Sequence, residues 1–212
     1  MIRPDSSNAF VMLVSAALVA TIALGSPRIA CATTSTEAML AARARLRAAA
    51  SSAKLNFPLA LPVIHIRKSI RALDLYDGGT LVRTYTVALG LNPEGAKTES
   101  GDMRTTEGTY FVCSRNDVSQ FHLFLGRSYP KTADAEAARK SGHIDAATAA
   151  RIARAESARQ KPDWSTKLGG AVGIHGGGTG RDWTWGCIAL SNEDIDELWC
   201  ACPVGTKVVI ER

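Results

Sequence analysis

The fold of this chain is constrained most by a change of hydrophobic pattern at Val63. From this residue onward, short runs of apolar and β-prone residues alternate with clusters of Gly, Asn, Asp and Pro. Runs of this length, separated by turn residues, predict strands and hairpins rather than helices. Asp77-Gly78-Gly79 predicts a tight hairpin turn. The expected strands, seven or eight in all, include 63–66, 72–76, 80–88, 109–113, 121–125, 171–174 and 206–211.

Helical segments are expected before and between these strands. The Ala-, Leu- and Arg-rich stretch 33–52 follows a candidate capping box formed by Thr34 and Glu37. Two polar helices without a strong apolar stripe are expected on the surface, and a short helix capped by Ser191 or Asn192 is expected near the end. These three helices cover 132–141, 145–159 and 193–200. The predicted fold class is a mainly β domain with appended helices.

The first 32 residues have the composition of an export signal. Arg3 precedes an uncharged apolar stretch over 10–24, and Ala30-Cys31-Ala32 supplies small residues before a cleavage point. The stretch is short for a free membrane span, which needs about 20 apolar residues. We therefore predict a signal peptide over 1–32, a helical segment and linker over 33–62, and one exported domain over 63–212. A lipid on Cys31 and an uncleaved anchor are the alternatives, and each is a route to the membrane.

Net charge limits the classes of binding partner that we expect, and cysteine content bears on disulfides. The net charge of +5 arises from 25 basic and 20 acidic residues that are interleaved along the chain. The chain has no basic stripe interleaved with aromatic residues, so we do not expect a nucleic acid as a partner. We do expect a weak attraction to an anionic wall polymer. An oxidising compartment favours disulfides, and the pairing of Cys113, Cys200 and Cys202 stays open.

The chemistry is expected in the segment 173–192. An expected strand brings His175 into a glycine-rich loop, and Cys187 follows twelve residues later at the head of another apolar run. A thiol that meets an imidazole can act as the nucleophile of acyl transfer, because the imidazole removes the thiol proton and later protonates the leaving amine. The alternative is structural: a buried cysteine, a hydrogen-bonded strand histidine and a tight turn packed by tryptophan.

Backbone groups around the cysteine complete this hypothesis. The N–H groups of Trp185, Gly186 and Cys187 are candidate donors to a developing oxyanion. Either the Asp182 side chain or the Gly176 carbonyl can orient the imidazole. The loop after His175 lacks the Gly-Lys-Ser/Thr ending of a phosphate-binding loop, so a nucleotide site is disfavoured.

Taken together, these motifs resemble the L,D-transpeptidase catalytic domain, the YkuD-type fold. The run His175-Gly176 … Trp185-Gly186-Cys187-Ile188 is similar to the family signature. Upstream matches in the expected order are Ile66-Arg67-Lys68-Ser69, Leu73-Asp74-Leu75-Tyr76, Tyr85-Thr86-Val87-Ala88-Leu89-Gly90, Gly101 to Tyr110, and Ser128-Tyr129-Pro130, with Gly205-Thr206-Lys207-Val208 downstream. The resemblance spans roughly 63–212 and implies a YkuD-like β-sandwich.

Three positions depart from the family pattern. Trp185 stands where much of the family has a second His, Ala189 where an Arg or Asn is frequent, and Thr106 where a Pro is common. The histidine carried over as the base is His175, so the thiol–imidazole pair is retained. The tryptophan implies a differently shaped, more apolar entrance to the site, and it leaves open the acyl acceptor and the balance between transfer and hydrolysis.

The resemblance implies an activity in the periplasm or cell envelope. Cys187 would attack the bond between a diamino acid and a terminal D-alanine in peptidoglycan stem peptides, with Tyr129, Trp183 and Thr184 lining the peptide groove. The acceptor would be a second stem amine, a wall-anchored protein, or water, which would make the protein a hydrolase such as an L,D-carboxypeptidase or amidase. No metal or organic cofactor is required. A catalytically weak wall-binding module is the third alternative.

Overall fold

The computed structural model describes residues 27–212, and eight strands in this part form one mixed sheet. The sheet order is β3-β2-β1-β8-β4-β5-β6-β7. The strands are β1 (Pro62–Arg67), β2 (Ala72–Asp77), β3 (Thr80–Thr86), β4 (Gly108–Ser119), β5 (His122–Arg127), β6 (Gly173–His175), β7 (Ile188–Ala189) and β8 (Lys207–Glu211). The predicted mainly β fold class with appended helices is confirmed.

The predicted turn between β2 and β3 is a two-residue hairpin at Gly78-Gly79. Both glycines have positive φ, 55° and 89°, which a two-residue turn of this kind requires at both central positions. Local sequence chemistry therefore sets the register of these strands, which pair from Asp77 with Thr80 onward.

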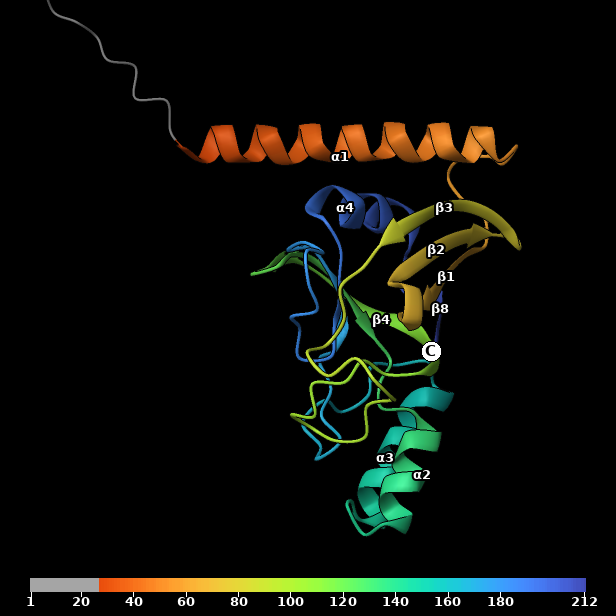
Figure 1. Cartoon of the computed structure of the whole chain (residues 1–212), viewed down its shortest axis with the longest axis vertical. Coiled ribbons are helices and arrows are strands. Elements are labelled where there is room, and N and C mark those ends of the chain that lie inside the picture. The colour runs from red at the N-terminus through yellow and green to blue at the C-terminus, as the bar shows by residue number, and fades with distance from the viewer. Residues whose placement is uncertain (1–26) are drawn as a thin grey trace, which may run out of the picture.

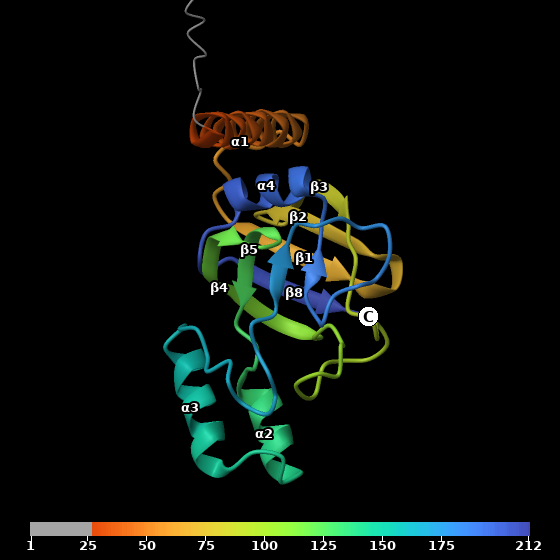
Figure 2. The ribbon, with the colours of Figure 1, turned by 90° about the vertical axis from the view of Figure 1, so that its left-hand side faces the viewer.

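The long strand β4 joins the two halves of the sheet. Residues 108–111 pair with β8, whereas the rest of β4 pairs with β5, and the register shifts between Val112 and Ser114. Because bulges bend a strand and increase its twist, the sheet curls into two layers. Figure 2 shows β5 and β6 lying in front of the layer that contains β1, β2 and β8. Apolar side chains fill the interior, among them Ile64, Leu75, Leu125, Ile174 and Val208.

Helix α1 (Pro27–Ser52) begins earlier than the sequence predicts. The predicted capping box is wrong, because Thr34 and Glu37 lie within the helix rather than at its start. Pro27 is a favourable first helical residue, and nothing between it and Thr34 interrupts a helix. The predicted leader Met1–Ala32 lies mostly outside the described residues, and its last residues, 27–32, belong to α1.

One face of α1 packs on α4 (Asn192–Ala201). Figure 1 shows α1 as a long rod across one end of the molecule, with α4 between it and the sheet. Leu46 and Ala50 are fully buried in this contact. Arg45 Nε lies 2.6 Å from the Glu197 carboxylate, whose side chain is inaccessible to solvent. This arginine is therefore an anchor of the helix rather than part of a solvated face.

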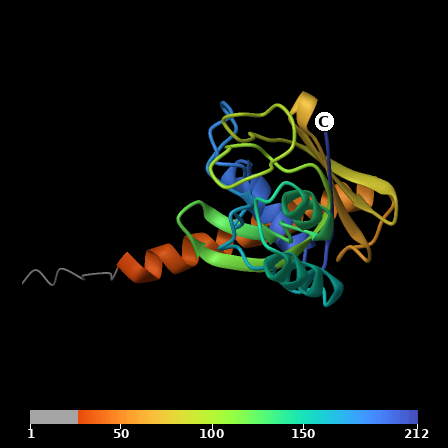
Figure 3. The same cartoon turned by 90° about the horizontal axis from the view of Figure 1, so that it is seen from below.

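Helices α2 (Thr132–Lys140) and α3 (Ala146–Ser157) form a hairpin at the opposite end of the molecule. Figure 3, seen from below, shows the two helices side by side. They lie on the surface, as predicted, although one side of each is buried through Ala135, Ala138, Ala149 and Ile152. Among the described residues, no helix has the length and apolarity needed to cross a membrane.

Candidate active site

Strands β6 and β7 bring the predicted cysteine and histidine to one face of the sheet. The two strands run parallel, with Ile174 opposite Ile188 and His175 opposite Ala189. Cys187 immediately precedes β7 and hence lies beside Gly173. Because side chains alternate along a strand, Gly173 and His175 share a face, so Cys187 and His175 lie diagonally on that face.

The Cys187 sulfur is held by backbone groups of the chain that leads into β6. Sγ accepts a hydrogen bond from Gly173 N at 3.4 Å and lies 3.8 Å from Ala171 O. Among the described residues, no hydrogen bond joins this sulfur to His175. The structure therefore places the thiol and the imidazole side by side, at β7 and β6, without a hydrogen bond between them.

His175 occupies an aromatic enclosure and is only 2% exposed. Phe121 stacks on the imidazole at 4.8 Å between ring centroids, and Trp183 meets it edge-on at 5.5 Å. Phe124 lies at 6.4 Å on the neighbouring strand. The sequence prediction included Trp183, as a substrate contact. It missed Phe121 and Phe124, which the sequence indicated only as members of the expected strand 121–125.

A backbone carbonyl fixes the protonation of the His175 ring. Nδ1 lies 2.6 Å from Gly176 O, and a carbonyl can only accept, so Nδ1 carries the hydrogen and Nε2 the lone pair in the neutral ring. Burial lowers the pKa of His175, and the charge of Arg127 adds to this, against the opposing hydrogen bond to Gly176. The neutral ring is therefore the resting form and has a free acceptor at Nε2.

The electrostatic environment of Cys187 combines opposing influences. Burial raises the pKa of the thiol, whereas the Gly173 N–H and the cations Arg127 and Lys97 act to lower it. Both cations lie far from Cys187 in sequence, and sequence analysis missed them. Because burial dominates, the resting sulfur is a thiol that requires a base to become a nucleophile.

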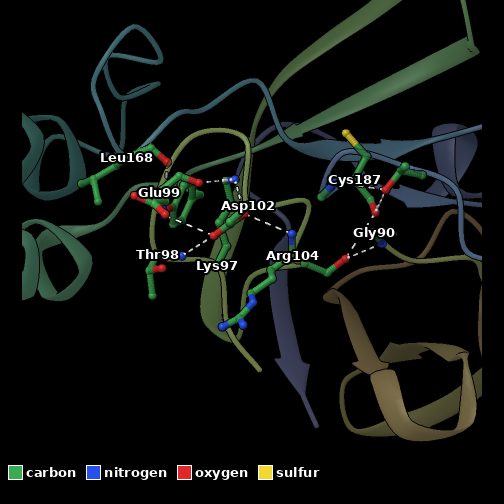
Figure 4. A network of polar contacts seen from close by, with 12 residues as sticks. Gly90, Lys97, Thr98, Glu99, Asp102, Arg104, Leu168 and Cys187 are labelled. Carbon is green, nitrogen blue, oxygen red and sulfur yellow. Dashed lines mark hydrogen bonds and ion pairs between the residues drawn. The ribbon is translucent and has the colours of Figure 1, made fainter. Parts of the chain in front are cut away.

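Thr184 organises the turn that presents Cys187. Its Oγ1 donates to Cys187 O at 2.7 Å and accepts from Gly186 N at 3.2 Å. Figure 4 shows the Cys187 carbonyl within this polar network, while its sulfur points away from it. Gly186 has φ of 116°, and a Cβ there would lie 2.6 Å from Arg104 O, so this turn requires glycine. The N–H groups of Trp185 and Cys187 remain as oxyanion candidates, because that of Gly186 is engaged.

Several other predicted site residues have structural contacts. Tyr129 is fully buried, donates to Leu168 O at 3.2 Å and lines a cavity beside loop residues 96–99 and helix α2, whereas Thr184 is buried within the turn before Cys187. Asp182 accepts from Arg71 Nη2 at 2.6 Å and from Leu89 N, which leaves the Gly176 carbonyl at the imidazole. Trp185 is 76% exposed beside the cysteine.

Two cavities are candidates for a substrate groove, although neither is lined by Cys187 or His175. One of about 580 Å³ lies between loop residues 96–99, helix α2 and Leu168. Lys97, one of its lining residues, donates to Glu99 O and to Asp102 Oδ1, both at 2.8 Å (Figure 4). A second, of about 320 Å³, is lined by Gly177, Gly178, Gly180, Arg181 and Trp183, next to His175.

The described cysteines carry no disulfide, and no metal cluster is present in this part of the chain. Cys113, Cys187, Cys200 and Cys202 are all free thiols. Within residues 27–212, no group of three or more His, Cys, Asp or Glu side chains is arranged to hold a metal ion.

Comparison with known proteins identifies one family. The family model described as YkuD, L,D-transpeptidase catalytic domain, matches residues 62–210. A search of curated proteins finds no match.

Solved structures with a similar fold come from several bacteria. An L,D-transpeptidase (residues 123–326) from Xylanimonas cellulosilytica is 17% identical, with a TM-score of 0.40, over 72% of this chain and 61% of that one. The helical cell shape determining protein Pgp2 from Campylobacter jejuni is 20% identical, with a TM-score of 0.48, over 72% of this chain and 48% of that one. Bd1075 from Bdellovibrio bacteriovorus is 19% identical, with a TM-score of 0.46, over 72% and 48%. The match therefore spans about half to three fifths of these chains.

Proposed function

Because the chain belongs to the YkuD-type family of L,D-transpeptidase catalytic domains, we propose that it is an exported cysteine acyltransferase of the bacterial cell envelope. Its substrates are the peptide stems of peptidoglycan. The observation that carries the proposal is the position of Cys187 and a neutral His175 on one face of paired parallel strands. An apolar enclosure around the imidazole supports a base that is uncharged at rest.

The reaction follows from the protonation states. His175 Nε2 takes the thiol proton as Cys187 Sγ attacks the carbonyl between the diamino acid and the terminal D-alanine. The electron pair of the carbonyl moves to its oxygen, which receives hydrogen bonds from the Trp185 and Cys187 N–H groups. As the C–N bond breaks, the imidazolium protonates the departing amine and leaves a thioester. The hydrogen bond between thiol and imidazole forms in the substrate complex, since catalytic hydrogen bonds are often long in free enzymes.

The cavity of about 580 Å³ is our candidate for the acyl-donor groove. Leu168, at its edge, lies three residues before Ala171, whose carbonyl contacts the Cys187 sulfur. The acceptor is an amine of a second stem or of a wall-anchored protein, and it approaches past the exposed Trp185. The Met1–Ala32 leader exports the protein to the periplasm. A lipid on Cys31 is the alternative in which the exported protein stays attached to the membrane.

Hydrolysis on the same scaffold is the second candidate function. Trp185 stands where the family frequently has a His, and this replacement favours hydrolysis. It alters the side of the site from which an amine acceptor approaches, so water competes as the nucleophile. The thioester is common to both reactions, and only the product differs: a cross-linked dimer for transfer, a tripeptide for hydrolysis.

Mass spectrometry of the purified protein with a disaccharide-tetrapeptide tests the proposal. We expect the wild type to gain the mass of the acyl group while D-alanine is released, and the Cys187→Ala variant to show neither. The soluble product then distinguishes a transferase from a hydrolase.

The control is a folded, fully reduced wild-type sample. An absence of adduct and turnover in that sample, identical to Cys187→Ala, would contradict the enzymatic proposal and favour a wall-binding module.

A further inference from the structure

Arg127, the last residue of β5, is a fully buried cation next to the site. Its side chain is 0% exposed. Nη1 donates to Thr106 Oγ1 at 2.5 Å, and Nη2 donates to Gly186 O at 3.1 Å. Nε has no hydrogen-bond partner among the described residues. The guanidinium is therefore bound only by neutral acceptors.

This cation has no carboxylate partner within residues 27–212. None of the ion pairs there includes Arg127, and a buried charge without compensation is strongly disfavoured. Arginine nevertheless stays protonated in proteins. Strongly perturbed charged groups of this kind cluster at functional sites.

The titratable acidic groups within electrostatic reach of Arg127 come from three segments. The groups whose negative charge would act on Arg127 are Tyr110 and Cys113 on β4, Tyr129 after β5, and Cys187 before β7, the residue that follows the Gly186 carbonyl bound by Arg127. Burial raises the pKa of both phenols, and it raises the pKa of Cys113 to about 11, so these three groups are neutral near pH 7. Cys187 is the one member of this set that loses its proton in the proposed reaction.

The contact with Gly186 O gives Arg127 a second effect on the site. Gly186 O and Cys187 N–H belong to one peptide unit and point in opposite directions. A charge-assisted hydrogen bond to the oxygen fixes this peptide plane and polarises its N–H. Thr184 Oγ1 holds the next carbonyl, that of Cys187, at 2.7 Å. Both peptide planes that flank the Cys187 Cα are thereby fixed.

We propose that Arg127 is a positioning residue of the reaction, as the buried counter-charge of the Cys187 thiolate and, through Gly186 O, the group that orients the Cys187 N–H toward the oxyanion. This inference rests on the proposed function. When the S–C bond forms, the negative charge passes from sulfur to the carbonyl oxygen, and the thiol proton stays on His175. Arg127 serves both charges without moving, because its hydrogen bond to Gly186 O places it one peptide unit from Cys187 and holds the peptide whose N–H binds the oxygen.

The pH dependence of Cys187 alkylation by iodoacetamide tests the counter-charge. The charged or titratable groups that influence this thiol are Arg127 on β5, Lys97 in the loop before β4 and, through the shared face, His175 on β6. Alkylation is followed on the Cys187 peptide by mass spectrometry, in the full-length protein. This readout requires no peptidoglycan.

Three variants separate charge from packing. Arg127→Gln keeps a donor and removes the charge, and we expect it to move the alkylation midpoint upward by about one pH unit or more. Arg127→Lys keeps the charge, so its midpoint should lie near the wild-type value. Its Cys187 should be acylated more slowly, because lysine lacks the planar guanidinium that donates to two acceptors at once. Arg115→Gln is the matched control: this arginine also donates to two carbonyls, Cys202 O and Trp199 O, and its loss should leave the midpoint unchanged.

An unchanged midpoint in folded Arg127→Gln would overturn the inference. If that variant does not fold, Arg127→Met, which replaces the charge with an apolar side chain, provides the same test. A shifted midpoint in a protein that forms no acyl-enzyme with the tetrapeptide would support the counter-charge and contradict the proposed peptidoglycan substrate instead.

Discussion

At the scale of single residues, His175 has an environment suited to a base. Aromatic rings cover it, and its Nδ1 hydrogen is committed to Gly176 O. Burial is the largest influence on its pKa, and it acts downward because an imidazolium loses more hydration than a neutral ring. The ring therefore remains neutral, and able to accept a proton, to lower pH than a histidine in water.

This environment predicts the acid limb of the activity profile. The ordinary pKa of histidine is 6.5, and a base with a lowered pKa stays unprotonated at a pH below that value. The pH at which kcat/KM falls to half on acidification should therefore lie below 6.5. The measurement is the pH dependence of thioester formation. Phe121→Ala, which opens the enclosure, should move the midpoint upward. A wild-type midpoint at or above 6.5 would contradict this prediction.

At the scale of elements, α1 is fastened to the domain by an apolar contact and a buried charge. Leu46 packs in the core, and the Glu197 carboxylate receives Arg45 Nε at 2.6 Å and the Tyr85 hydroxyl at 3.0 Å. Sequence analysis predicted the helix but not this anchor. The partners of Glu197 lie more than 100 residues away in sequence, so no local pattern marks them.

The anchor predicts unequal effects of two leucines in one helix. Leu46→Ala removes a fully buried side chain and should lower the free energy of unfolding by about 3 kcal/mol. Leu40, which is 63% exposed on the same helix, is the matched control, and Leu40→Ala should change stability by less than about 0.5 kcal/mol. Chemical denaturation measures both. Equal effects would mean that α1 is not docked as described.

At the scale of the whole molecule, the large cavity is assembled from three distant segments. Loop residues 96–99, helix α2 and Leu168 are separated along the chain by β4, β5 and α3, and only the folded chain brings them around one cavity. The same convergence brings Lys97 within electrostatic reach of Cys187.

This convergence predicts that the cavity can be blocked from a helix that takes no part in the chemistry. Ala137 is exposed on α2 and lines the cavity, so Ala137→Trp should raise KM for the tetrapeptide about tenfold or more, the effect of losing about 1.4 kcal/mol of binding. Ala150→Trp, at an exposed position of α3 outside the cavity lining, is the control. Steady-state kinetics of D-alanine release provide the measurement. Equal KM values in the two variants would show that the donor does not occupy this cavity.

The sequence alone determined the local features of this protein. Strand period, the Gly78-Gly79 turn and the Ser191 cap depend on neighbouring residues, and so does the placement of His175 and Cys187 on adjacent runs. Tertiary structure decided what surrounds them: the burial of Tyr129, the engagement of Asp182 with Arg71, and the approach of Arg127 and Lys97 to the thiol. Burial and charge act through space, and the groups that supply them are brought together only when the two layers of the sheet close on each other.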